Sequence, residues 1–248
     1  FSITGQPNAM GGREVGGLAN MLAAHMDIDN PDHREMVQSF WQSPSIPQRT
    51  GSKAVDLFEA VESGKVKAIW IMATNPVVSM PNRNHIQRAL EKCEVVVVSD
   101  CVERNDTLEF ADISLPATTW SEKDGTVTNS ERRISRQRGL VTAPGEARHD
   151  WKIICDVANK MGFGEAFDYQ HPAQIFDEHA RLTAHQNDGS RDLDLSGLTG
   201  MSIAQYDELK PVQWPVNSQY PAGKQRLFED GRFYTEDGKA RFIALTAQ

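Results

Sequence analysis

The fold class is decided by the stretch KAIWIMATNPVVSMPNRNHIQRALEKCEVVVVSD (Lys67–Asp100). It contains two apolar runs, Ala68–Ala73 and Val95–Val98, joined by roughly 20 residues with a helical pattern. Fully apolar short strands joined by a helix are typical of a parallel sheet. Ligands of such sheets bind beyond the carboxyl ends of the strands, where both runs here end in small polar residues. We therefore expect a strand–helix–strand unit with a nucleotide-like ligand at its tips.

The composition excludes several classes of protein. The chain has 248 residues, 39% of them hydrophobic, which is ample for a globular core. Its formal net charge of −8 argues against a general nucleic-acid binder. No stretch approaches the ~18 to 20 apolar residues that cross a bilayer, so we expect no membrane partner either. The three cysteines, Cys93, Cys101 and Cys155, form no CxxC pair, which favours reduced thiols over a disulfide frame or a metal site.

The start of the chain and its patterns predict how it is divided. The first residue is Phe1 rather than Met and no signal segment follows, so we expect a piece of a longer chain, in which the absence of a signal here says little about the compartment. Strong patterns predict an α/β domain over residues 1–163. The weaker patterns of residues 164–248 predict an irregular extension or linker. Within it, Arg226–Leu245 alternates like a strand pair about the turn Asp237–Gly238.

Three polar segments can each be interpreted in more than one way from the sequence. The opening Thr4–Gly17 has five glycines in fourteen residues, which predicts a loop rather than a helix, on the surface or lining a ligand. The basic cluster NSERRISRQRG (Asn129–Gly139) is either a solvated face or a contact for phosphate or a partner. The spacing of His171, His179 and His185 matches no metal motif, so surface histidines are expected.

Polar residues at or after the strand ends form the candidate site: Asn75, Ser99, Asp100, Lys123 and Asp150. Each has a structural alternative, as a turn residue, a helix cap or a solvated lysine. Together at the mouth of a parallel sheet they suit a nucleotide, because acids accept from ribose or guanine and a lysine offsets negative charge. There is no GxGxxG after a strand, no P-loop and no GxSxG, and no nucleophile with its base is recognisable. We therefore expect cofactor-binding residues but no catalytic ones.

Five motifs in order resemble the molybdopterin oxidoreductases of the dimethyl-sulfoxide-reductase family, and within it the assimilatory nitrate reductases: TGQPNAMGGREVGG, ATNPVVSMPN, VVVVSD, ADISLPATTWSEKDGTVTNSERRISR and APGEARHDW. The resemblance covers Phe1 to about Met161. In the tail, GRFYTEDGKARF resembles the link before the family's C-terminal domain. The resemblance implies a Rossmann-like α/β domain that holds one of two molybdopterin guanine dinucleotides, which together ligate a molybdenum ion.

The resemblance also implies roles and partners. Asn75, Ser99 and Lys123 would contact the dinucleotide, Asp100 would bind its ribose and Asp150 its guanine edge. The implied reaction is oxygen-atom transfer from nitrate, giving nitrite, in the cytoplasm, with an electron donor protein or reductase subunit as partner. The family's [4Fe–4S] cysteine motif and its molybdenum ligand are absent from this chain. We therefore expect the cluster and the remaining domains in the parent protein, and an inactive fragment.

Three alternatives remain open. A formate dehydrogenase of the same family is disfavoured by the opening motif, where Asn-Asn and Asp-Met-Gly would be expected instead of QPNAMGGREVGG. A molybdenum-free electron-relay subunit, like the large iron–sulfur subunit of respiratory NADH dehydrogenase, would have no reason to keep the five dinucleotide contacts. The third alternative is a nucleotide-binding domain unrelated to molybdenum. Molybdenum and guanine nucleotide in the full-length protein would separate these alternatives.

Overall fold

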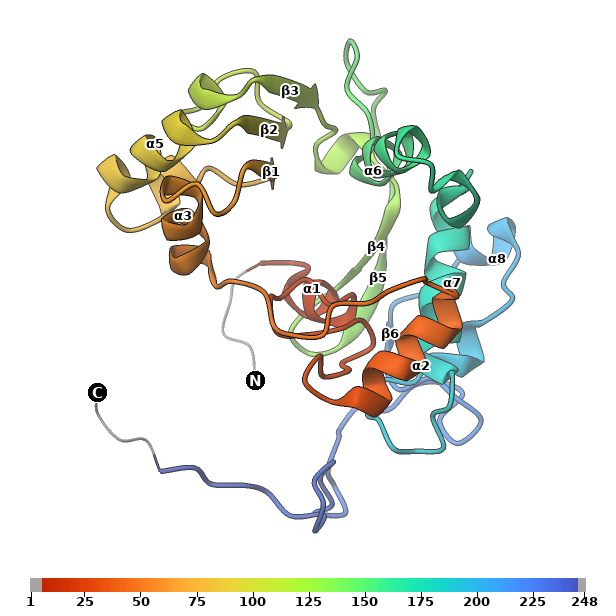
Figure 1. Cartoon of the computed structure of the whole chain (residues 1–248). Helices are drawn as coiled ribbons and strands as arrows, with labels where there is room; N and C mark the ends of the chain where they lie inside the picture. The colour runs from red at the N-terminus through yellow and green to blue at the C-terminus, as the bar shows by residue number, and fades with distance from the viewer. Residues whose placement is uncertain (1–5, 245–248) are drawn as a thin grey trace. The chain divides into compact units, whose positions relative to one another are not determined.

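The computed structural model describes residues 6–244, which Figure 1 traces from red to blue. These residues form two compact units that interleave along the chain. The first unit combines the described residues up to Arg49 with Thr126–Arg136 and those from His171 onward, and the second combines Thr50–Gly125 with Gln137–Gln170. This division differs from the expected one, which had a single boundary between residues 163 and 164.

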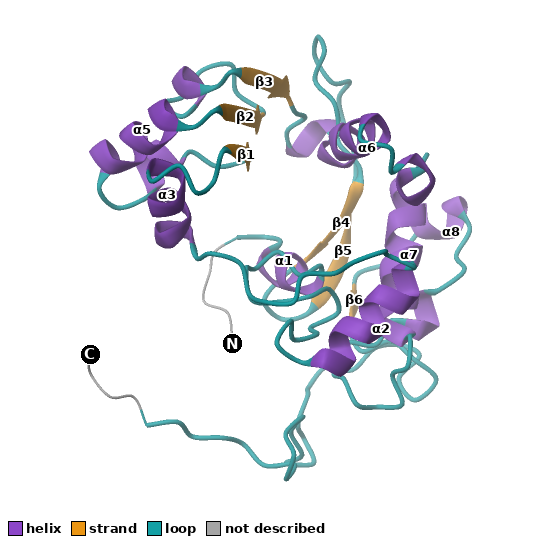
Figure 2. Ribbon diagram, in the orientation of Figure 1, coloured by secondary structure: helices purple, strands orange, loops and turns teal. Residues whose placement is uncertain are grey.

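A parallel sheet forms the centre of the second unit. Its strands are β1 (Ala68–Met72), β2 (Val95–Asp100) and β3 (Ile113–Pro116), in the order β1-β2-β3. Both neighbouring pairs are parallel, and Figure 2 shows the three arrowheads pointing the same way. The predicted strand–helix–strand unit is therefore confirmed, as is the parallel sheet.

The helices of the second unit are α3 (Ala54–Glu62), α4 (Pro76–Ser79), α5 (Arg83–Lys92), η1 (Leu108–Phe110), η2 (Trp120–Glu122), α6 (Asp150–Lys160) and η3 (Gly164–Phe167). Two of them, α3 and α5, cover one face of the sheet. Phe58 of α3 and Ile86 of α5 pack in one core with Val96 and Val98 of β2. Each such side chain contributes about 1.5–3 kcal/mol through burial. Figure 2 shows α3 and α5 on the same side of the sheet.

The first unit combines helices with a second sheet. Its elements are α1 (Ala9–Glu14), α2 (Pro31–Trp41), β4 (Gly125–Thr128), β5 (Arg133–Gln137), α7 (Pro172–Ala184), η4 (Ser196–Leu198), α8 (Ile203–Asp207) and β6 (Val212–Gln213). The sheet has the order β4-β5-β6, and β5 pairs antiparallel with β6. Tyr206 and Trp214 are buried in its main core with Ile134 and Phe176. None of the helices that the structure describes is both long and apolar enough to span a bilayer.

The glycine-rich opening is helical where a loop was expected. Residues Ala9–Glu14 form α1, which includes two glycines. A Cβ on Gly11 would lie 2.0 Å from Asn8 Oδ1, so this position is occupied by glycine because of close packing. Gly16 then adopts a φ of +75°, which turns the chain after the helix. The expectation of a loop was wrong because it weighed glycine propensity alone and could not include tertiary contacts.

The described part of the expected extension, residues 164–244, is more ordered than expected. They contribute α7, α8 and much of the main core of the first unit. The turn at Asp237–Gly238 is present, since the Gly238 N–H donates to the Thr235 carbonyl over 3.0 Å. The strand pair predicted over 226–245 is absent from its described residues, 226–244. A turn signal therefore did not suffice to predict the strands on either side of it.

Two arginines of the basic cluster fit neither of its two interpretations, whereas Arg138 is exposed, as a solvated face would be. The Arg136 side chain is 2% exposed and bonds to Asp207 over 3.0 Å. It also lies 4.1 Å from the centroid of the Tyr206 ring. Arg132 donates to the carbonyl oxygens of Trp214, Lys224 and Gln225. Both arginines therefore stabilise the first unit from within, in contacts that the local sequence could not reveal.

The three histidines also differ from simple surface residues. His171 Nδ1 accepts from the Ala173 N–H and caps α7, and the His185 ring packs 5.3 Å from Phe40. His179 is half-buried, and its Nε2 is enclosed without a partner among the described residues. The expectation of surface histidines is therefore wrong for His179.

Acid is expected to weaken the first unit through His179. Burial lowers the pKa of His179 from 6.5 to about 4, with the charge of His25 acting in the same direction. Between these values the unfolded chain binds a proton and the folded chain does not. The free energy of unfolding should therefore fall by roughly 3 kcal/mol at most as the pH drops through this range.

Urea unfolding at pH 7 and at pH 4.5 measures this acid sensitivity. His179→Leu should lose less stability between the two pH values than the unsubstituted chain does. His171→Asn, which keeps a capping side chain, serves as the control and should behave like the unsubstituted chain. Equal acid sensitivity in His179→Leu would show that His179 does not cause the loss of stability in acid.

Candidate functional site

The carboxyl ends of the strands and the segment before α6 form one continuous row. The Ala73 N–H, just after β1, donates to the Ser99 carbonyl at the end of β2 over 2.9 Å. The Ala117 N–H, just after β3, donates to the Asp100 carbonyl over 2.9 Å. Ala117 also pairs in parallel with Arg148, which precedes α6. The segments that carry the predicted site residues are therefore neighbours within the second unit.

Asn75 lies in the turn that follows β1. Ala73 has a φ of +53°, an uncommon conformation for a residue with a Cβ, and it redirects the chain at the strand end. The Asn75 Oδ1 accepts from the Thr107 hydroxyl over 2.7 Å, and Thr107 is fully buried. Its amide nitrogen has no partner among the residues described. Asn75 is thus held in place with two N–H donors left for a ligand.

Asp100 is fixed at the tip of β2. Its Oδ1 accepts from the Cys101 N–H over 2.7 Å, and its Oδ2 accepts from Asn105 Nδ2 over 2.9 Å. Asn105 is itself held by the Leu108 N–H over 2.8 Å, at the start of η1. The carboxylate is half-buried, so part of it still faces solvent. A preorganised acceptor at a strand end suits a hydroxyl donor such as a ribose.

Ser99 lies in the same row, but its side chain is engaged elsewhere. The residue has no exposed surface, and its hydroxyl accepts from Trp70 Nε1 over 2.7 Å. In this conformation a ligand at the sheet edge has no access to the hydroxyl. The contact with Trp70 could not be predicted from the sequence, because a partner across two strands depends on their register.

Lys123 and Asp150 form an ion pair. Lys123 Nζ lies 2.7 Å from Asp150 Oδ2, with side-chain exposures of 26% and 30%. Asp150 is the first residue of α6, where the helix dipole favours a negative charge. The sequence predicted both residues for one site, and the structure brings their charged groups into contact.

Three buried polar atoms near Asp150 lack partners among the described residues. They are Thr118 Oγ1, His149 Nδ1 and Trp151 Nε1. Burial lowers the pKa of His149, and the charge of Lys152 lowers it further, so its ring is neutral near pH 7. Buried polar groups nearly always have partners, so a water molecule or a ligand is expected beside these three atoms. None of these three residues was predicted for the site, although His149 and Trp151 flank Asp150 in the motif APGEARHDW.

Comparison with protein families identifies the chain. Residues 5–160 match the sequence model of the molybdopterin oxidoreductases. The chain belongs to the molybdopterin oxidoreductase family. The family resemblance of the five motifs is thereby confirmed.

Individual relatives place the chain within this family. A nitrate reductase of Klebsiella oxytoca is 50% identical over all of this chain and 28% of its own length. A nitrate reductase of Shewanella frigidimarina is 52% identical over 98% of this chain and 26% of its own length. The F420-dependent formate dehydrogenase subunit alpha of Methanocaldococcus jannaschii is 33% identical over 98% of this chain and 33% of its own length. The chain therefore spans between a quarter and a third of the length of each of these relatives.

A solved structure supports the fold. Acetylene hydratase from Pelobacter acetylenicus matches with a TM-score of 0.57 over 94% of this chain and 27% of that chain. At 19% sequence identity this likeness concerns the fold alone. It agrees with the α/β class expected for a molybdopterin oxidoreductase.

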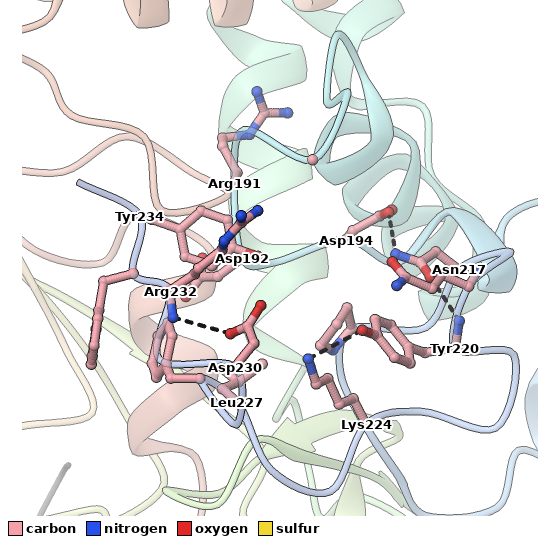
Figure 3. Close-up of a pocket in the computed structure, with 15 residues that line it drawn as sticks. Arg191, Asp192, Asp194, Asn217, Tyr220, Lys224, Leu227, Asp230, Arg232 and Tyr234 are labelled. Carbon is pink, nitrogen blue, oxygen red and sulfur yellow. Dashed lines mark hydrogen bonds between the residues drawn. The ribbon is translucent and has the colours of Figure 1, made fainter. Parts of the chain in front are cut away.

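The first unit of this molybdopterin oxidoreductase chain also contains a cavity of about 450 Å³ (Figure 3). Carboxylates, aromatic rings and basic groups line it together, and Figure 3 shows Asp230 between Arg232 and Leu227. Lys224 Nζ donates to the Tyr220 hydroxyl at its edge over 3.1 Å. None of the five predicted site residues lines this cavity. Among the described residues, no three His, Cys, Asp or Glu side chains gather as a metal site.

Proposed function

We propose that the second unit is part of the cradle for a molybdopterin guanine dinucleotide in a molybdenum nitrate reductase. The observation that carries the proposal is the row of strand ends with Asn75, Asp100 and the Lys123–Asp150 pair. The three partnerless buried atoms beside Asp150 support it, because they are the polar groups that a bound ligand would satisfy. The family match and the identities of 50% and 52% to nitrate reductases support the assignment of cofactor and reaction.

Each of these residues suits a different part of the dinucleotide because of its hydrogen-bonding chemistry. Asp100 accepts from ribose hydroxyls, and the amide of Asn75 donates to phosphate or pterin oxygens. Asp150 accepts from the N–H groups on the guanine edge, and Lys123 keeps the local charge balanced beside it. The Ser99 hydroxyl stays with Trp70, so any contribution of Ser99 comes through its backbone or after a change of rotamer. When bound, the molybdenum–pterin group supplies the two-electron oxygen-atom transfer that converts nitrate to nitrite.

The rest of the proposed enzyme lies outside this chain. The molybdenum ligand from the protein and a [4Fe–4S] cluster belong to other parts of the parent. An electron donor protein or reductase subunit supplies the electrons, and the cytoplasm is the proposed compartment. The two units described here contribute cofactor binding and not a catalytic side chain.

A formate dehydrogenase is the second candidate. The relative from Methanocaldococcus jannaschii supports it at 33% identity, against 50% and 52% for the two nitrate reductases. The same cradle serves either reaction, because both would use the same cofactor. The substrate therefore has to be determined on the full-length protein.

Three measurements on the purified full-length protein test the proposal. We expect molybdenum, GMP after acid release, and reduction of nitrate to nitrite with a reduced viologen dye. Formate oxidation with no nitrate reduction would support the second candidate and contradict the nitrate assignment. The absence of both molybdenum and guanine nucleotide would contradict the cofactor itself.

A further inference from the structure

The two faces of the parallel sheet in the second unit differ in what covers them. Side chains alternate between the faces along a strand, and paired residues of neighbouring parallel strands share a face. Ile71 of β1 is paired with Val98 of β2, and both belong to one core with Val96. Phe58 of α3 and Ile86 of α5 complete that core. One face of the sheet is therefore covered by α3 and α5 (Figure 2).

The opposite face, here termed the open face, is almost entirely apolar. The register places Trp70 beside Val97, and Val97 beside Ile113. By the same alternation, the open face consists of Ala68, Trp70 and Met72 of β1, Val95, Val97 and Ser99 of β2, and Ile113 and Leu115 of β3. No member carries a charge. Ile113 is 49% exposed and Val95 is 39% exposed, although both are large apolar residues.

The open face has no apolar layer packed on it among the described residues. Trp70, Met72, Val97 and Leu115 are half-buried, and none of the four belongs to any of the three cores that the described residues form. Parallel sheets are almost always covered on both faces. A contiguous apolar surface of this kind marks an interface. The open face is therefore expected to have a partner.

The connections between the strands explain why this chain covers only one face. The strands follow one another in a single direction, β1-β2-β3, and connections between parallel strands are right-handed. Such connections all lie on the same face. Accordingly, α5 joins β1 to β2, and Leu108 and Phe110 of η1, between β2 and β3, pack in the same core. Helices on the open face need connections that run in the opposite direction, as in doubly wound sheets. Among the described residues, no further strand joins this sheet.

The lengths of the relatives indicate where such helices come from. Two nitrate reductases match nearly all of this chain with only 28% and 26% of their own length. In a parent protein of similar length, most of the residues lie outside these 248. An uncharged apolar surface fits the apolar stripe of an amphipathic helix, whereas it offers no attraction to a charged partner such as a nucleic acid.

We propose that amphipathic helices of the parent chain, from outside these 248 residues, pack on the open face and form the second helical layer of this sheet. They bury Val95 and Ile113 and lie against Trp70. The open face is then an internal interface of the enzyme and not a docking site for a separate protein. The inference rests on the proposal that the chain is part of a longer enzyme, but not on the identity of its cofactor or substrate.

Photo-crosslinking in the full-length protein tests the proposal. p-Benzoylphenylalanine takes the place of Ile113 in one variant and of Val95 in a second, so that the test remains available if one variant does not fold. After irradiation and digestion, mass spectrometry should find a cross-link within one chain to a peptide from outside these 248 residues. Val55 of α3 is 46% exposed and lies outside the open face. The same replacement at Val55 is the matched control and should not capture that peptide.

Four results would overturn the proposal. A product of twice the chain mass would show that a second copy covers the open face. A cross-link only to peptides within these 248 residues would show that the two units cover it themselves. No peptide product at either position would show that the face is exposed to water, and capture of the same peptide from Val55 would show that the contact is not specific to this face. Molybdenum and GMP are measured on the same samples, so a failure of the cofactor proposal is recognised separately.

Discussion

Asp150→Ala in the full-length protein is expected to reduce the retained guanine nucleotide strongly. A carboxylate that accepts from two guanine N–H groups makes charge-assisted bonds of about 1.5–3 kcal/mol each. Losing both corresponds to a fall in affinity of about a hundredfold or more. The substitution also leaves Lys123 without the partner that it has at 2.7 Å. The measurement is GMP released by acid per mole of protein.

A neighbouring residue of the same helix provides the control. Asp156 pairs with Arg148 over 2.6 Å, and its side chain is 58% exposed. Asp156→Ala removes a carboxylate from α6 at an exposed ion pair, and should leave the GMP content unchanged. Asp150→Asn should fall between the two variants, because it keeps one acceptor oxygen and loses the charge. Unchanged GMP in Asp150→Ala would remove Asp150 from the site.

Trp214→Ala is expected to destabilise the first unit most. Trp214 is 1% exposed in the main core of that unit, and its Nε1 donates to Glu14. Truncating a buried tryptophan to alanine costs about 3–5 kcal/mol through lost burial and the cavity that remains. Circular dichroism during urea unfolding would measure the loss.

An exposed tryptophan is the matched control for this loss. Trp120 is 48% exposed, so Trp120→Ala should change the free energy of unfolding by no more than about 0.5 kcal/mol. Equal stability of the two variants would contradict the central position of Trp214. A loss confined to Trp214→Ala would agree with the packing described.

The second unit could be predicted from sequence to a large extent. The two apolar runs, Ala68–Ala73 and Val95–Val98, are long enough and apolar enough to define buried parallel strands. Parallel strands end at one edge, so the positions of Asn75 and Asp100 followed from the strand order. Their supporting contacts, such as Thr107 to Asn75, did not, because they depend on the exact return path of the chain.

The first unit could not be predicted in the same way. The Glu14 contact with Thr128 joins residues 114 apart, and its contact with Trp214 joins residues 200 apart. Local patterns carry no signal for such pairs, so the interleaving of the units was missed. The helix α1 and the internal role of Arg136 were missed for the same reason, since tertiary contacts override propensity and charge pattern.

The position of the cofactor cradle is the central claim, and hydrogen exchange tests it directly. The measurement compares the full-length protein loaded with its cofactor and the same protein from cells that cannot make it. Peptides containing Asn75, Asp100 and Asp150 should exchange more slowly in the loaded protein. Peptides of α7 (Pro172–Ala184) should exchange equally in both, which controls for general unfolding. Equal exchange in the peptides containing Asn75, Asp100 and Asp150 would contradict this position of the cofactor.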